Sequence, residues 1–176
     1  APYGLEVFDA YYTSIHSGSI IAKVCHSGSK LNEKTKRYHE TLQNDQKYNM
    51  DSYKEFFAKV ESYKDRLHSL LTSLKDDGKV IYAYGAPAKG NTLLNYCGLT
   101  SKIVDKAVEI NKLKVGFYMP QSHIPIVLES PEDLPDYYLL LSHNFESEIL
   151  SKNKDILKKG VKFIIPFPEI KIIGMP

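Results

Sequence analysis

The clearest pattern in the chain is a helical repeat of apolar residues in its first half. Apolar side chains recur at alternating spacings of four and three, at Phe56, Val60, Tyr63, Leu67, Leu70 and Leu74. Such spacing places them along one face of a helix. Asp51 is a candidate N-cap and Gly78 a candidate C-terminal stop. We therefore expect one long helix between these two residues.

The segment before this helix predicts a hairpin and a polar connection. Residues 5–12 and 19–24 have the composition of extended strands, and the stretch 14–18 between them is turn-prone. Residues 29–49 are rich in charged side chains, as in a solvated helix or linker. We expect residues 1–50 to form a hairpin and helical linker that pack on the following domain.

After the long helix, short apolar runs alternate with helical or loop segments. Strands are predicted at 80–84, 106–110, 124–127, 137–142 and 161–165, and helices start at Thr92 and span 145–158. Strands that alternate with helices form a parallel sheet, because right-handed crossovers return each strand to the same direction. For residues 51–176 we therefore predict a Rossmann-like three-layer α/β/α domain with a mainly parallel sheet of about five strands.

Charge and hydropathy exclude several classes of partner. Lys and Arg number 23 against 21 Asp and Glu, so the net charge of +2 gives no reason to expect nucleic acid. No apolar run reaches the roughly 20 residues of a membrane helix, and no secretory signal precedes the first strand. We expect a cytoplasmic protein with no membrane partner. Because the sequence begins without Met, we also expect a piece of a longer chain.

The cysteines and histidines give no indication of a metal site. None of the following has metal-ligand or CxxC spacing: Cys25, Cys97, His16, His26, His39 and His68. We therefore assign no metal ligand.

The first predicted strand leads into a loop that is the main candidate for a binding site. Ligands of such sheets bind beyond the carboxyl ends of the strands. Two glycines allow a tight turn, and free N–H groups at the following helix start can bind an anion such as phosphate. A plain strand-to-helix turn explains this spacing equally well. The loop comprises Gly85, Ala86, Pro87, Ala88, Lys89, Gly90, Asn91 and Thr92.

Polar residues near the other strand ends add further candidates. Glu109 lies close to the offset, roughly 20 residues after the glycine loop, at which an acidic residue bonds a ribose hydroxyl. Lys114 could neutralise a phosphate, and His123 beside two prolines could be held for hydrogen bonding or proton transfer. A surface carboxylate and an exposed loop histidine are the simpler alternatives. Asn144 follows the fourth strand.

The string from Val80 to Gly98 closely resembles the signature of the C-terminal domain of bacterial deoxysugar C-methyltransferases. Residues 109–116, with Glu109, Asn111, Lys114 and Gly116, resemble that family's Asp-x-Asn-Pro-x-Lys-x-Gly segment. Segments 4–9, 15–20, 119–126 and 160–168 also resemble parts of that domain, so the resemblance covers nearly the whole chain. Departures from the family pattern are Glu109 for Asp, Gln121 for Gly, and Ser142-His143-Asn144 for Ala-Trp-Asn.

The resemblance implies one part of a three-part enzyme. In that family a zinc-binding module and an S-adenosylmethionine-binding domain precede a Rossmann-like domain that houses the nucleotide-sugar pocket. It implies that S-adenosylmethionine serves the full-length enzyme, that this part binds no cofactor, and that its partners are the missing methyl-donor domain and a thymidine-diphosphate-linked keto-deoxysugar. Residues 85–92 would then cradle the pyrophosphate, Glu109 would bond a ribose hydroxyl, and Asn111, Lys114, His123 and Asn144 would line the pocket.

Methylation of a sugar carbon needs a base and an enolate stabiliser. The family's Glu-His pair, associated with its active site, would lie upstream of Ala1, so we expect this part alone to be inactive. Two other functions stay open. One is a stand-alone, non-catalytic nucleotide-binding or scaffolding domain. The other is an NAD(P)-dependent oxidoreductase, which is disfavoured because the loop is neither GxGxxG nor a Walker sequence.

Overall fold

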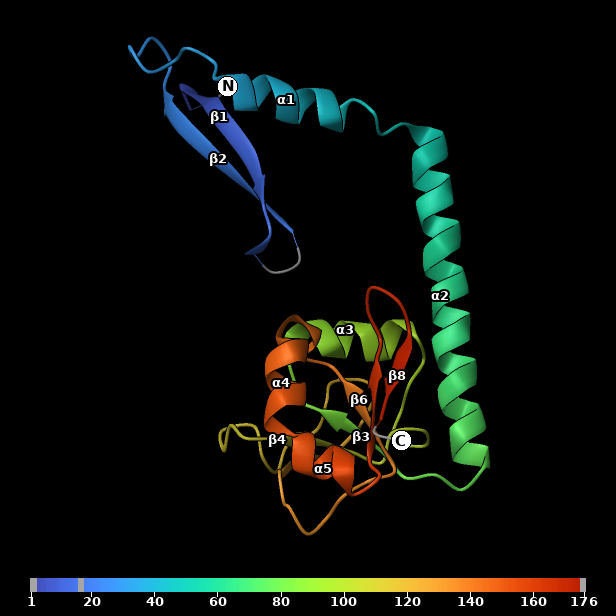
Figure 1. The fold of residues 1–176 in the computed structure, drawn as a ribbon. Coiled ribbons are helices and arrows are strands. Elements are labelled where there is room, and N and C mark those ends of the chain that lie inside the picture. Colours follow the sequence, from blue (N-terminus) through green and yellow to red (C-terminus); the bar gives the residue numbers. More distant parts are fainter. Residues whose placement is uncertain (1–2, 16–17, 175–176) are drawn as a thin grey trace. The chain divides into compact units, whose positions relative to one another are not determined.

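The computed structural model describes residues 3–15 and 18–174. They belong to two compact units, Ala1–Lys59 and Val60–Pro176. Their border falls inside the long helix α2 (Met50–Asp76) (Figure 1). Residues 16 and 17, in the middle of the predicted hairpin turn, lie outside the described residues. No helix in the described ranges is both long and apolar enough to cross a membrane.

The first unit contains the predicted hairpin. Strand β1 (Leu5–Thr13) pairs antiparallel with β2 (Ser19–His26), and the polar segment that follows forms α1 (Lys36–Asp45). Asp9 is buried in β1 and accepts hydrogen bonds from the Thr35 hydroxyl, at 2.6 Å, and from Arg37. The Thr35 hydroxyl and Arg37 hold the pKa of Asp9 below its ordinary value, although burial opposes them. Asp9 therefore ties the hairpin to α1.

Helix α2 begins two residues earlier than expected, because Asn49 and not Asp51 caps it. The Asn49 Oδ1 atom accepts from the N–H groups of Asp51 and Ser52, both at 3.0 Å, and the Ser52 hydroxyl accepts from the Asn49 N–H. The predicted N-cap at Asp51 was thus wrong, and Asp51 lies in the first turn. The predicted stop is confirmed: the helix ends at Asp76, and Gly78 follows with a φ of 74°.

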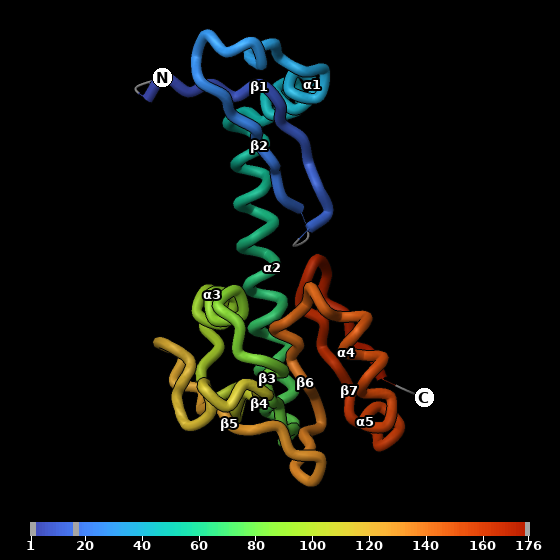
Figure 2. Tube along the Cα trace, turned by 90° about the vertical axis from the view of Figure 1, so that its left-hand side faces the viewer, coloured from blue at the N-terminus to red at the C-terminus, as the bar shows by residue number. Residues whose placement is uncertain are grey.

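The second unit is built on a six-stranded sheet within the described residues. Its order, β5-β4-β3-β6-β7-β8, can be followed in Figure 2 as far as β7. Strands β3 to β7 run parallel to one another, and β8 runs antiparallel to β7. The strands are β3 (Ile81–Tyr84), β4 (Lys106–Glu109), β5 (Ile126–Leu128), β6 (Tyr137–Leu140), β7 (Lys162–Ile165) and β8 (Lys171–Ile173).

The sequence predicted β3 to β7 but not β8. Strand β8 has three residues, two of them exposed, and it follows a proline-containing segment. Its strand character comes from pairing with Phe163, Ile164 and Ile165 of β7. Pairing with a distant strand leaves no pattern in the three residues themselves. The sheet therefore has one strand more than the five or so that the sequence predicted.

Successive residues of the buried strands point to opposite faces of the sheet, as the pleat requires. Ile81 and Ala83 pack in a cluster with Leu67 of α2 and Leu94 of α3 (Ala88–Tyr96). On the other face, Tyr82, Tyr138, Leu140 and Phe163 pack with Leu157 of α5 (Lys154–Lys158) and with residues of α4 (Glu146–Lys152). Helices therefore cover both faces, and the mixed α/β architecture with a mostly parallel sheet is confirmed.

The helix predicted at 145–158 is interrupted. A 3-10 turn, η2 (His143–Phe145), precedes α4, and Asn153 separates α4 from α5. The Asn153 backbone leaves helical geometry, and its side-chain amide donates to the Ile149 carbonyl at 2.8 Å and to the Tyr84 hydroxyl at 3.1 Å. This interruption points a polar side chain towards the end of β3.

Candidate functional site

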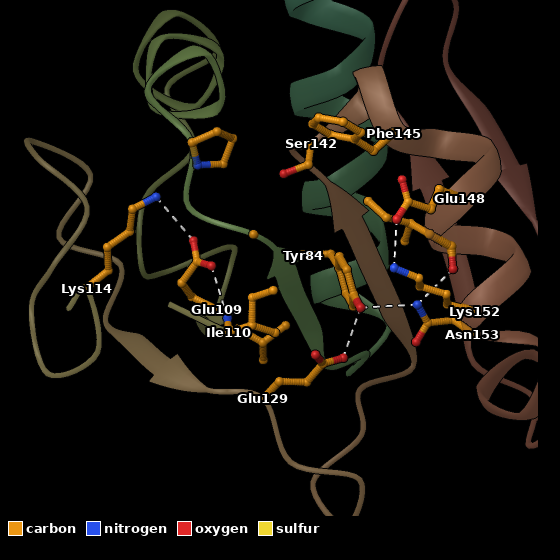
Figure 3. Close-up of a pocket in the computed structure, with 14 residues that line it drawn as sticks. Tyr84, Glu109, Ile110, Lys114, Glu129, Ser142, Phe145, Glu148, Lys152 and Asn153 are labelled. Atoms are coloured by element: carbon orange, nitrogen blue, oxygen red, sulfur yellow. Dashed lines mark hydrogen bonds and ion pairs between the residues drawn. The ribbon is translucent and has the colours of Figure 1, made fainter. Parts of the chain in front are cut away.

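A pocket of about 540 Å³ opens at the carboxyl ends of β3, β4 and β6 (Figure 3). The strand order reverses here, because the chain moves from β3 to β4 and β5 on one side and to β6 and β7 on the other. Open α/β sheets bind their ligands at such a point. The lining residues are Tyr84, Gly85, Pro87, Val108, Glu109, Ile110, Lys114, Glu129, Ser142, Phe145, Glu148, Ile149, Lys152 and Asn153.

Gly85 makes the turn at the end of β3. Its φ is 84°, its N–H donates to the Val108 carbonyl at 2.8 Å, and a Cβ atom added to it would lie 2.6 Å from the Ser142 hydroxyl oxygen. The left-handed backbone favours glycine, and a larger residue would also force the Ser142 hydroxyl to rotate away. Gly85 therefore contacts both Val108 of β4 and Ser142, which lies just after β6.

The predicted loop is shorter than expected. Only residues 85–87 are irregular, because α3 begins at Ala88 and runs through Thr92. Pro87 is the N-cap and gives no side-chain hydrogen bond to the helix start. In the described part of the chain, the N–H groups of Ala88, Lys89 and Gly90 have no acceptor, since the first helical bond runs from Asn91 to Pro87. The helix thus presents three unpaired donors and the positive end of its dipole.

A second hollow, of about 160 Å³, lies at this helix start. It shares Pro87, Ser142 and Phe145 with the larger pocket, so the two adjoin. Its lining includes Ala88, Lys89 and Asn144 of the predicted site.

Gly90 has a packing role. A Cβ atom added to it would lie 2.7 Å from Cβ of the buried Leu141, so glycine lets α3 approach the end of β6. Thr92 is exposed, and its hydroxyl donates to the Ala88 carbonyl at 3.3 Å. Neither these two residues nor Asn91 lines either hollow.

Glu109 organises the loops around the pocket. Its Oε2 atom accepts from the Ala86 N–H at 3.1 Å and from Lys114 Nζ at 3.3 Å, and Oε1 accepts from the N–H groups of Ile110 and Asn111. A carboxylate offers about four acceptor positions, and here the chain itself occupies them. Burial acts to raise the pKa of Glu109, but the N–H groups of Asn111 and Ala86 and the Lys114 ammonium outweigh it and keep the pKa below its ordinary value.

The lowered pKa of Glu109 predicts a specific pH dependence. Its stabilisation should be fully present above the ordinary value of 4.5 and be lost as the pH falls through the lower pKa of the folded state. Glu109→Gln removes this titration, so its free energy of unfolding should fall less steeply in acid than that of the wild type. Urea unfolding at a series of pH values measures both slopes, and equal slopes would contradict the assignment.

The remaining predicted residues lie in different places. Lys114 reaches the pocket and also donates to the Ala86 carbonyl at 3.0 Å. The side chain of Asn111 is exposed and closes a local turn by accepting from the Leu113 N–H. His123 is exposed three residues before β5, at the amino end of the strand, while the pocket lies at the carboxyl ends. The structure does not bring His123 to either hollow.

The lining residues that were not predicted from the sequence include three that hydrogen bonds join, Tyr84, Glu129 and Asn153. Tyr84 donates its hydroxyl proton to Glu129 at 3.0 Å and accepts from the Asn153 amide, as the dashed lines in Figure 3 show. Burial raises the pKa of Tyr84 to about 12, so its proton stays in place at neutral pH. Glu129 follows the last residue of β5, and the strand-tip rule would have found it if the strand had been extended to Leu128. Asn153 lies within an apparently continuous helix and gives no signal.

A search of the described residues finds no group of three or more His, Cys, Asp or Glu side chains that could hold a metal ion.

Comparison with known proteins identifies the family. Residues 14–168 match the model of the C-methyltransferase C-terminal domain. The chain is also 34% identical over 179 aligned residues to the C-methyltransferase NovU of Streptomyces niveus. That alignment covers 98% of this chain and 42% of NovU, so the chain spans less than half the length of this relative. The chain belongs to the C-methyltransferase C-terminal domain family.

Proposed function

We propose that this chain is the nucleotide-sugar-binding part of an S-adenosylmethionine-dependent sugar C-methyltransferase, and that residues 51–176 form its Rossmann-like domain. The observation that carries the proposal is the pocket at the reversal of strand order. It adjoins a helix start with unpaired N–H groups, and the Lys114 ammonium reaches it. Such an arrangement suits an anion joined to a larger neutral body.

The diphosphate of the ligand would lie at the start of α3, over Gly85 and the N–H groups of Ala88 to Gly90, with Lys114 as a counter-charge. The Glu109 carboxylate would act by holding this loop, because its acceptor positions are already filled. The second hollow, with Asn144 in its lining, would extend the site along the helix start. The proposed ligand is a thymidine-diphosphate-linked keto-deoxysugar.

Carbon methylation requires removal of a proton beside a ketone and attack of the resulting enolate on the sulfonium methyl group of S-adenosylmethionine. On our proposal, this part supplies the binding of the nucleotide-sugar. The methyl donor and the catalytic base belong to the remainder of a longer, cytoplasmic enzyme. The name of NovU and the short share of its length that is matched here support this division.

Isothermal titration of the chain tests the proposal. We expect thymidine diphosphate to bind and S-adenosylmethionine not to bind. Lys114→Ala should weaken nucleotide binding at least about tenfold, since a hydrogen bond to a charged group contributes roughly 1.5–3 kcal/mol. Lys112→Ala is the matched control, because Lys112 is exposed two residues away and does not line the pocket. Binding of S-adenosylmethionine without the nucleotide would contradict the proposal, and affinity for NAD would favour an oxidoreductase.

A further inference from the structure

The charges around the pocket are balanced except at Glu129. Glu109 pairs with Lys114 at 3.3 Å, and Glu148 pairs with Lys152 at 2.7 Å. Among the described residues, no Lys, Arg or His lies within ion-pair distance of Glu129. The only excess negative charge in the pocket lining of the described chain is therefore on this residue, which is half-buried between β5 and the end of β3. An anionic group of a ligand would be repelled from this end of the pocket.

The hydrogen bonds around Glu129 have a fixed direction. Both N–H groups of the Asn153 amide are used, one by the Ile149 carbonyl and one by the Tyr84 hydroxyl. Because a carbonyl oxygen can only accept, the amide orientation is settled. Tyr84 in turn donates its proton to Glu129 Oε1 at 3.0 Å. The donors of Asn153 and Tyr84 are therefore committed within the protein, and the Glu129 carboxylate has none.

The polar atoms of these side chains that remain available to a ligand are hydrogen-bond acceptors. Glu129 Oε2 and Asn153 Oδ1 receive no hydrogen bond from the described part of the chain. Asn153 is 6% exposed and Tyr84 is only partly exposed, so the framework that holds these acceptors is packed into the protein. We call Tyr84, Glu129 and Asn153 the acceptor floor of the pocket. A group that binds here must bring hydrogen-bond donors.

We propose that the acceptor floor binds the hydroxyl groups of a sugar ring of the ligand. This rests on the proposed function and adds the orientation of the substrate: hydroxyl groups lie on Glu129 and Asn153, and the diphosphate lies towards Lys114 and the start of α3. Adjacent ring hydroxyls can donate one proton to each acceptor. A thymine or uracil ring fits less well, because its single ring N–H can satisfy only one of the two acceptors and is flanked by two carbonyl oxygens. The sugar ring could be the hexose or the pentose of the nucleotide.

The same substitution at two glutamates, one inside the pocket and one outside it, tests this inference. Glu129→Gln removes the unpaired charge but keeps an oxygen that accepts from Tyr84, so the fold should be retained. Glu132→Gln makes the same change at an exposed carboxylate that does not line the pocket and whose side chain makes no hydrogen bond or ion pair within the described residues, and it is the control. Each variant and the wild type are titrated calorimetrically with thymidine diphosphate and with thymidine-diphosphate-glucose.

We expect Glu129→Gln to weaken binding of the glucose conjugate about tenfold or more, and Glu132→Gln to leave it within about twofold. An unchanged affinity of Glu129→Gln for thymidine diphosphate would assign the floor to the hexose, and an equal loss for both ligands would assign it to the pentose. No loss for either ligand would overturn the inference while leaving nucleotide binding intact.

Failure of the wild type to bind either nucleotide would instead contradict the proposed function. The floor is then tested by NMR titration of the ¹⁵N-labelled chain with methyl α-D-glucopyranoside. A shift of the Asn153 side-chain amide signals that is absent in Glu129→Gln would support sugar binding, and no shift in the wild type would overturn it.

Discussion

Replacement of Glu109 by alanine should lower the free energy of unfolding by about 3 kcal/mol and abolish nucleotide binding. The Glu109 side chain is 11% exposed, and its removal leaves the Ala86, Ile110 and Asn111 N–H groups and the Lys114 ammonium without their acceptor. The turn would keep the bond from the Gly85 N–H to Val108 but lose the bond from the Ala86 N–H to the carboxylate. The N–H groups at the start of α3, which we propose bind the diphosphate, would then be held less firmly.

Urea unfolding and calorimetric titration of Glu109→Ala measure both effects. Glu132→Ala serves as the control, because Glu132 is exposed and its side chain makes no hydrogen bond or ion pair within the described residues. The control should change stability by less than about 0.5 kcal/mol. A loss at Glu109 as small as that of the control would show that the carboxylate does not hold the loop.

Replacement of Gly90 by valine should destabilise the protein by about 3 kcal/mol, at the upper end of typical overpacking costs. The first added carbon would already lie 2.7 Å from Leu141 Cβ, which is close to the backbone of a residue that is 1% exposed and cannot swing aside. Helix α3 would have to move away from β6, and the pocket wall formed by Pro87 and Ser142 would widen.

Thr92→Val is the comparison for Gly90→Val. It places the same side chain in the same helix, but at an exposed position, so its effect on the free energy of unfolding should stay within about 0.5 kcal/mol. Thermal or urea unfolding of the two variants gives the difference directly. If Gly90→Val were as stable as Thr92→Val, close packing would not be the reason for glycine at this position.

The buried strands could be predicted because their side chains carry the signal locally. Segments such as 80–84 and 161–165 are almost entirely apolar and are bounded by turns, which is typical of strands covered by helices on both sides. Strand β8 could not be predicted, since pairing with β7 alone defines it. The break at Asn153 was hidden for a similar reason: the partner of its side chain, Tyr84, lies 69 residues away in sequence.

The site was predictable in position but not in its hydrogen bonds. Parallel strands bring the residues after β3 and β4 to one edge, so Gly85, Glu109 and Lys114 were correctly expected near one another. The partners of Glu109 are mostly backbone N–H groups, which no sequence pattern identifies. Gly90 was assigned to the loop because two glycines allow a tight turn, but it lies inside α3, where close contact with Leu141 requires glycine.

An NMR map of the residues that contact the nucleotide in solution tests the proposed site most directly. Amide signals of the ¹⁵N-labelled chain are followed by NMR as thymidine diphosphate is added. We expect shifts at Gly85 to Gly90 and at Glu109 to Lys114, with little change at residues 119–125 around His123, which lie at the amino end of β5. Shifts concentrated at 119–125, or no shifts at all, would contradict a nucleotide site at the carboxyl ends of β3, β4 and β6.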